Sequence, residues 1–300
     1  MRSLLLAAAA VLSSAQAQPP DTEVFLAALT TSGGVIAVAA PQNISNSPGY
    51  DNQPSFTTDG RGLLFTSARG GAAQGTTTAQ MDIFRYDIAT KAVSQVTRTP
   101  ESEYSATVTP DGKHISVIRV EADKAQRLWK FPLSGGAPSL VFTDIKPVGY
   151  HAWLDANTVA MFVLGEPATL QVGDVRTGKA EVVASDIGRS LQPVPGGGVS
   201  FIQRAGLGTE RTMTVSLLSA AGSGRTTKVL TPVAPGATEE FVAWMPDGTL
   251  LMAAGGQLHA WKQGQTQWRA IADLSALGLR NVSRLAVSPK GEWLALVAAR

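Results

Sequence analysis

The sequence contains no cysteine, so it offers neither a disulfide framework nor an N-terminal cysteine for lipid attachment. No apolar run is long enough to span a bilayer, and we expect no transmembrane anchor. Neither sign of charge dominates, since 25 Lys and Arg stand against 23 Asp and Glu, and we expect no nucleic-acid partner. A long helical pattern is also missing, whereas 30 glycines and 17 prolines are typical of many short strands and turns.

The first residues have the pattern of a secretory signal peptide. Arg2 precedes a short apolar run at 4–12, and a small-x-small motif ends at Ala17. We therefore expect a signal peptide over 1–17, cleaved after Ala17, and a single mature domain over 18–300.

The mature chain repeats a short unit in which a strand runs into a tight turn and a second strand follows. Two copies with an Asp-Gly turn occupy 52–67 and 104–118, and Asp-Gly between alternating apolar residues predicts a hairpin. Asn157 takes the position of the turn glycine in the third copy. One residue before the turn recurs about every 46 residues and aligns the six copies: Phe56, Val108, Trp153, Pro193, Trp244 and Val287.

Each period has room for four strands. After the first hairpin, the patterns at 82–87 and 93–97 predict two more. Four strands in a period of this length are typical of a β-propeller blade. The six copies therefore predict an all-β fold with six blades. Only 13 residues follow Val287, whereas two strands can form before the first unit, at 23–29 and 35–39. We expect these N-terminal strands to complete the last blade and close the ring.

The stretch 50–67 resembles the WD40-like (PD40) repeat of TolB-type propellers, in which Ser-aromatic-Ser-Pro-Asp-Gly leads into a Leu-x-aromatic strand. Residues 82–87, Asp-Ile-Phe-Arg-Tyr-Asp, are similar to the third strand of that repeat. The resemblance covers 22–300 and implies a bacterial protein of the periplasm or the secreted fraction. The same repeat occurs in a protein-binding component of the Tol–Pal envelope system and in the propeller of prolyl-oligopeptidase-like enzymes.

Propellers bind ligands at the mouth of the central channel, and the repeat alignment indicates which residues surround it. Counting back six residues from the turn aspartate selects one residue in each blade: Gln53, Ser105, Tyr150, Ser190, Phe241 and Arg284. With the neighbouring positions included, we expect a ligand-binding rim of these residues: Asp51, Asn52, Gln53, Glu103, Tyr104, Tyr150, His151, Arg189, Ser190, Glu239, Glu240 and Arg284. In such a rim, acidic residues on one side of the channel would face arginines on the other side. Alternatively, these acids and arginines simply form ion pairs with one another.

The pattern favours an exported binding protein without catalysis, which engages a protein, a peptide or a small ligand at the channel mouth. No Gly-x-Ser-x-Gly motif predicts a nucleophile, no two histidines fall at metal-ligand spacing, and no cofactor is expected. The alternative is a calcium-dependent hydrolase of the lactonase or esterase type, with oxygens around the ion from Asp51, Asn52, Glu103, Glu239, Glu240 and Asn281. A third possibility is an accessory subunit that docks through the sides of the propeller.

Overall fold

The computed structural model describes residues 20–71, 79–221 and 224–300, so the expected signal peptide lies outside the described residues. Within these ranges the chain forms β-strands and one 3₁₀ turn, η1 (Gly208–Glu210). No helix in the described part is long and apolar enough to cross a membrane.

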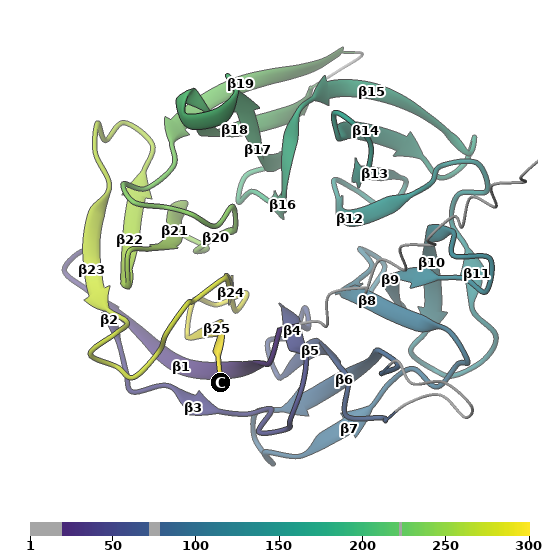
Figure 1. The fold of residues 1–300 in the computed structure, drawn as a ribbon, viewed down its shortest axis with the longest axis horizontal. Helices are drawn as coiled ribbons and strands as arrows, with labels where there is room; N and C mark the ends of the chain where they lie inside the picture. Colours follow the sequence, from purple (N-terminus) through teal and green to yellow (C-terminus); the bar gives the residue numbers. More distant parts are fainter. Residues whose placement is uncertain (1–19, 72–78, 222–223) are drawn as a thin grey trace, which may run out of the picture.

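The strands form six sheets around a central axis, which is the predicted six-bladed β-propeller (Figure 1). We number the blades from 1 to 6 by their inner strands, in order β4 (Asp51–Phe56), β8 (Ser102–Val108), β12 (Val148–Trp153), β16 (Ile187–Pro193), β20 (Val242–Trp244) and β24 (Arg284–Val287). The second strands are β5 (Gly62–Ser67), β9 (His114–Val120), β13 (Thr158–Val163), β17 (Val199–Ala205), β21 (Thr249–Ala254) and β25 (Trp293–Ala299). The third strands are β6 (Asp82–Asp87), β10 (Gln126–Pro132), β14 (Thr169–Asp174), β18 (Thr212–Ala221), β22 (Gln257–Lys262) and β1 (Thr22–Ser32). The outer strands are β7 (Val93–Gln95), β11 (Ser139–Leu140), β15 (Lys179–Ser185), β19 (Gly224–Pro232), β23 (Arg269–Asp273) and β2 (Val35–Val38).

Blade 6 contains both ends of the described chain. Its strand order is β2-β1-β25-β24, and the short β3 (Gln42–Asn43) pairs with the other side of β1. β1 runs antiparallel to β25, with Thr22 opposite Ala299 and Ala28 opposite Trp293. Figure 1 shows this contact as the purple β1 beside the yellow C-terminal strands. The sheet that joins the ends is therefore made of strands separated by almost the whole sequence.

The turn between β4 and β5 explains why the hairpin unit recurs. The hydroxyl of Thr57 donates to Asp59 at 2.6 Å, and the backbone N–H of Arg61 donates to the same carboxylate at 3.0 Å. Gly60 completes the turn at a φ of +70°, which favours glycine. Blade 2 repeats this turn at Thr109 and Asp111. In blade 3, Asn157 takes the position of the turn glycine but is not among the described residues with positive φ, so it does not reproduce the left-handed conformation of Gly60.

Apolar contacts between neighbouring blades form the core. Six buried clusters lie in the described structure, and each joins two adjacent blades. At the junction of blades 6 and 1, for example, Val24 and Val297 pack with Leu63 and Phe65. A second strand such as β5 is buried along its whole length because it has a blade on either side.

The inner strands are irregular near the channel mouth. The pairing of β4 with β5 shifts between Asn52 and Ser55, and that of β8 with β9 shifts between Tyr104 and Thr107. Gln53 and Ser105 lie in these bulges at positive φ, +57° and +54°. A bulge redirects the side chains around it, so the bulges decide which residues face the channel.

Candidate functional site

A cavity of about 460 Å³ occupies the centre of the propeller, and all six blades contribute residues to it. This volume lies in the range of about 300–1,000 Å³ that is typical of small-ligand sites. The register position six residues before the turn aspartate lines the cavity in every blade: Gln53, Ser105, Tyr150, Ser190, Phe241 and Arg284. The register of the repeat therefore places one residue of each blade on the cavity wall.

Half of the twelve expected rim residues line the cavity, and half do not. Those that line it are Gln53, Tyr150, His151, Arg189, Ser190 and Arg284. Those that do not are Asp51, Asn52, Glu103, Tyr104, Glu239 and Glu240. Successive side chains of a strand point to opposite faces, which turns Asn52 and Tyr104 away from the cavity. The bulges that follow in β4 and β8 break this alternation and turn Asp51 and Glu103 away as well. The sequence predicts an acidic arc around the cavity, but no Asp or Glu of the described structure lines it.

Three of the carboxylates expected at the rim are instead buried beside arginines of the blades. Asp51 pairs with Arg69 at 3.3 Å and is 1% exposed. Glu103 is fully buried and lies 3.5 Å from Arg119. The third, Glu240, pairs closely with Arg204 of β17. These acids are therefore part of the blade structure.

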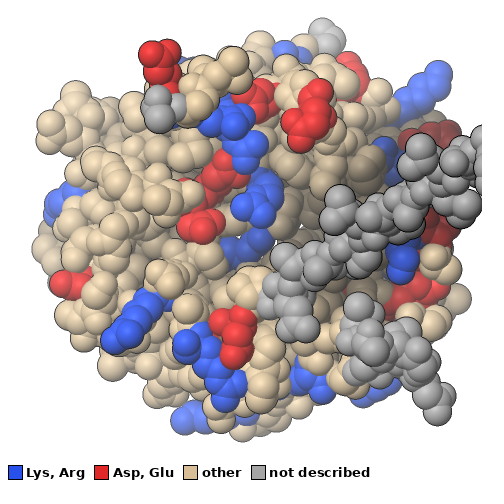
Figure 2. Space-filling model, in the orientation of Figure 1, with Lys and Arg blue, Asp and Glu red and all other residues tan. Residues whose placement is uncertain are grey.

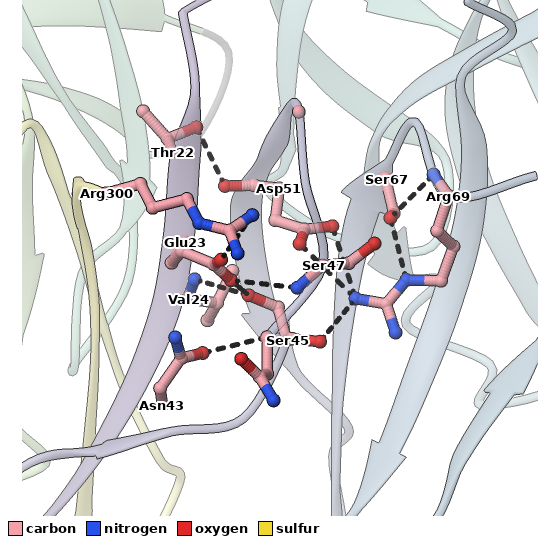
Figure 3. A network of polar contacts seen from close by, with 12 residues as sticks. Thr22, Glu23, Val24, Asn43, Ser45, Ser47, Asp51, Ser67, Arg69 and Arg300 are labelled. Atoms are coloured by element: carbon pink, nitrogen blue, oxygen red, sulfur yellow. Dashed lines mark hydrogen bonds and ion pairs between the residues drawn. The ribbon is translucent and has the colours of Figure 1, made fainter. Parts of the chain in front are cut away.

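Asp51 belongs to a polar network at the junction of blades 6 and 1 (Figure 3). The guanidinium of Arg69 donates to Asp51 and to the backbone oxygen of Ser45. The hydroxyl of Ser45 in turn donates to the buried Glu23 at 2.6 Å, and Glu23 lies 3.5 Å from Arg300. Burial raises the pKa of Asp51, and the hydrogen bonds and charge of its neighbours oppose that rise.

Among the expected rim residues, Glu103 is a buried acid whose pKa is strongly raised. Its Oε1 accepts a hydrogen bond from the Thr99 hydroxyl, whereas its buried Oε2 has no partner. Burial raises the pKa of Glu103 to about 7, and the nearby Asp82 adds to the rise. Glu103 therefore titrates near neutral pH in the junction of blades 1 and 2, away from the cavity.

His151 lines the cavity but is held as a structural side chain. Its Nε2 lies 2.8 Å from the Thr107 hydroxyl and 2.7 Å from the Ser116 hydroxyl, both in blade 2. Burial lowers the pKa of His151 to about 3, so the imidazole is neutral at physiological pH. Its Nδ1 is buried without a hydrogen-bond partner. The imidazole thus tethers blade 3 to blade 2.

Arg284 extends from blade 6 to aromatic residues of blades 3 and 5. Its guanidinium lies 3.7 Å from the centre of the Phe241 ring and donates to the Tyr150 hydroxyl at 2.7 Å. Arg189 also lies over Phe241, at 5.9 Å. Blades 3 and 6 are on opposite sides of a six-bladed ring, so the contact between Arg284 and Tyr150 crosses the channel. We call Tyr150, Phe241, Arg189 and Arg284 the mouth cluster.

The mouth cluster makes the cavity cationic. Arg189 and Arg284 are the lysine or arginine side chains that line it in the described structure, and no Asp or Glu of that structure does so. The nearest acid to Arg189 is Glu240, with 4.0 Å between the guanidinium and the carboxylate, and Glu240 is already paired with Arg204. Figure 2 shows basic side chains beside the central hollow, with acidic ones next to them on the same face. The cavity therefore suits an anionic group.

Away from the mouth cluster, the cavity has an aromatic and apolar wall. The residues that align the six repeats all line it: Phe56, Val108, Trp153, Pro193, Trp244 and Val287. The indole N–H of Trp153 donates to Ser116 at 2.9 Å, and that of Trp244 donates to Ser200 at 2.8 Å. Both tryptophans are half-buried. The periodicity of the sequence identifies these six positions as equivalent, but it does not indicate that their side chains face a cavity.

Calcium would need several oxygen ligands that converge, and the residues named for it are dispersed. Asp51, Glu103 and Glu240 each have their own arginine, as described above. The described residues contain no group of three or more His, Cys, Asp or Glu side chains arranged to hold a metal ion.

Comparison with known proteins identifies the fold through structure alone. No family model matches the sequence, and no curated protein matches it. Among solved structures, a putative TolB from Agrobacterium tumefaciens superposes with a TM-score of 0.66 at 14% identity, over 93% of this chain and 98% of that chain. TolB from Acinetobacter baumannii gives a TM-score of 0.58 at 12% identity, over 93% of this chain and 64% of that chain. A chain of a nidogen/laminin complex also gives 0.58 at 12% identity, over 92% of this chain and 98% of that chain. The chain thus has a TolB-like propeller fold.

Proposed function

We propose that this protein is an exported, non-catalytic binding propeller that engages a protein, a peptide or a small ligand at the channel mouth. The observation that carries the proposal is the pair Arg189 and Arg284, which line the cavity next to aromatic rings. The one carboxylate beside them in the described structure, Glu240, is shared between Arg189 and Arg204. A concave site that is lined by cationic groups and by no acidic ones favours a ligand of opposite charge. The proposal needs no cofactor or metal ion.

The neighbouring structures are compatible with a binding role but assign none. One of them is a nidogen/laminin complex, so a chain of similar fold is found there with another protein. At 12–14% identity such a likeness concerns the fold, and the site has to carry the functional argument. Here the site supplies cationic and aromatic groups, and its one histidine is neutral and buried.

Export is part of the proposal and has its own test. We expect the protein from the native cells to begin at Gln18, because the motif that ends at Ala17 has the pattern of a signal-peptidase site. Mass spectrometry of the N-terminal peptide from periplasmic and culture fractions checks this. A protein that keeps Arg2 in those fractions would contradict it.

Binding at the mouth is tested with a double variant, Arg189→Gln with Arg284→Gln. The wild-type mature protein is immobilised, and the molecules that it retains from envelope extracts are compared with those retained by the variant. We expect the variant to lose its main partner. Arg176→Gln is the matched control, because Arg176 lies in an exposed hairpin turn and pairs with Asp174. If the double variant retains every partner as well as the control does, the site is wrongly assigned.

A further inference from the structure

The cavity has two chemically different parts, and together they restrict what can occupy it. The mouth cluster supplies two guanidinium groups that lie against the same ring, Phe241. The rest of the wall is largely apolar and includes Trp153 and Trp244. A ligand that fills both parts must be anionic at one end and apolar at the other.

Arg284 is held by interactions that a carboxylate can replace. Its contacts in the structure are the faces of two aromatic rings and the neutral hydroxyl of Tyr150. A carboxylate would form charge-assisted hydrogen bonds with the guanidinium, which are stronger than a bond to a neutral oxygen. The planar fork of an arginine also matches the two oxygens of a carboxylate.

Arg189 is placed to take part in the same contact. Its side chain is 49% exposed, whereas the neighbouring Arg204 is 22% exposed and is paired with Glu240. Glu240 accepts the backbone N–H of Arg189 at 3.1 Å, and its carboxylate lies 4.0 Å from the guanidinium of Arg189. Arg189 thus shares this one acid with Arg204. Two arginines and one ring thus surround the same position at the mouth.

The tryptophans favour an apolar group rather than a hydroxyl-rich one. Both indole N–H groups are already used between blades, in the bonds of Trp153 to Ser116 and of Trp244 to Ser200. The surface that these rings can offer to a ligand is therefore carbon. Burying an apolar group against this surface is favourable, since it removes apolar area from water.

We propose that the ligand class is a monocarboxylate joined directly to an apolar or aromatic group, with the carboxylate between Arg189 and Arg284 and the apolar group toward Trp153 and Trp244. This inference rests on the proposed function, because it names the ligand chemistry of the same cavity. The carboxyl terminus of a peptide that ends in an apolar residue and a free aryl-alkyl acid share this chemistry.

The test compares an acid with its amide, which have nearly the same shape but differ in charge. Calorimetric titration of the mature protein with N-acetyl-L-phenylalanine and with N-acetyl-L-phenylalanine amide should show the acid binding about tenfold more tightly or better, as expected for hydrogen bonds to a charged group. In Arg284→Gln this preference should fall to about threefold or less. Arg284→Lys should restore part of it, because Lys keeps the charge but lacks the planar fork.

The apolar part of the proposal has a separate measurement. Acetate should bind at least tenfold more weakly than N-acetyl-L-phenylalanine to the wild-type protein, because the apolar group contributes only when it is buried. Trp244→Leu should weaken the binding of the phenylalanine derivative and leave that of acetate unchanged. A tripeptide, Ala-Ala-Phe with a free carboxylate, distinguishes the sources. Tighter binding of the tripeptide indicates a peptide terminus, and equal binding indicates a small acid.

The proposal is overturned if the acid and the amide bind equally, or if acetate binds as well as the phenylalanine derivative. It is also overturned if none of the probes binds at a probe concentration of about 10 mM, which is roughly tenfold above typical metabolite levels. These failures differ from failure of the proposed function. If the double arginine variant loses its partner from envelope extracts but the acid is not preferred over the amide, the mouth is a binding site for another ligand class. If the double variant keeps every partner, the binding site itself is wrong.

Discussion

Arginines occupy two kinds of place in this propeller, the junctions between blades and the central channel. At the junctions, Arg69 and Arg119 face the buried carboxylates of Asp51 and Glu103. In the channel, Arg284 rests on aromatic rings and lacks a carboxylate partner in the described structure. Arginine is thus paired with a buried acid of its own blade at the junctions, whereas in the channel Arg284 has no such acid beside it among the described residues.

The difference lies in the partner and in the solvent. A buried ion pair fixes two elements, but it contributes little net stability because both charges lose their hydration. An arginine on an aromatic face keeps most of its charge available, and the contact itself is weak when exposed to water. Loss of Asp51 should therefore destabilise the fold, because Arg69 stays largely buried without its partner, whereas loss of a channel charge should mainly affect binding.

The largest expected effect is at the junction of blades 6 and 1. Asp51→Ala should lower the free energy of unfolding by about 3 kcal/mol, because it leaves the Arg69 charge largely buried without its partner. Urea denaturation of the mature protein measures this loss. The double variant Asp51→Asn with Arg69→Met is the control and should lose less than Asp51→Ala, since it removes both charges. A loss under about 1 kcal/mol in Asp51→Ala would show that the junction does not depend on this pair.

A smaller effect, which depends on pH, is expected at the junction of blades 1 and 2. The folded protein holds the pKa of Glu103 at about 7, above the value of 4.5 for a free side chain. The folded state thus binds this proton more tightly than the unfolded state, so Glu103 lowers stability progressively as pH rises from about 4.5 to about 7. Glu103→Gln removes this penalty and should raise the free energy of unfolding at pH 8 by roughly 2 kcal/mol.

The measurement for Glu103 is a difference between two proteins across pH. Asp51 and Asp82 also have pKa values raised by burial, so the pH dependence of the wild type alone does not isolate Glu103. The stability of Glu103→Gln minus that of the wild type should be small at pH 4.5 and larger at pH 8. A difference that stays constant over this range would mean that Glu103 does not titrate there.

The repeat pattern was sufficient to predict the architecture, because it depends on local chemistry. The Asp-Gly turn at Asp59 and Gly60 forms within a few residues and marks each hairpin along the chain. The same register predicts which residue of each blade, such as Tyr150 or Arg284, meets the channel. Periodicity and turn chemistry thus determine both the blades and one ring of the site.

The electrostatics of the site could not be predicted in the same way. Gln53 and Asp51 are two residues apart, yet only Gln53 lines the cavity, since a bulge between Asn52 and Ser55 redirects the strand. The partner of Asp51 is Arg69, which only the folded hairpin brings close. A pair between residues 18 positions apart leaves no local signal in the sequence. From the sequence alone, a buried acid such as Asp51 therefore cannot be distinguished from an acid that is exposed at the rim.

The smallest effect on stability should come from the channel, and it gives the sharpest contrast with the junctions. Arg284→Gln removes a guanidinium from the faces of Phe241 and Tyr150, and a contact of this kind at a partly exposed site contributes about 0.5 kcal/mol. We expect urea denaturation to show a loss of that order, well below the loss in Asp51→Ala. A loss of about 2 kcal/mol or more would place Arg284 with the junction arginines, and the division between structural and ligand-binding arginines would no longer hold.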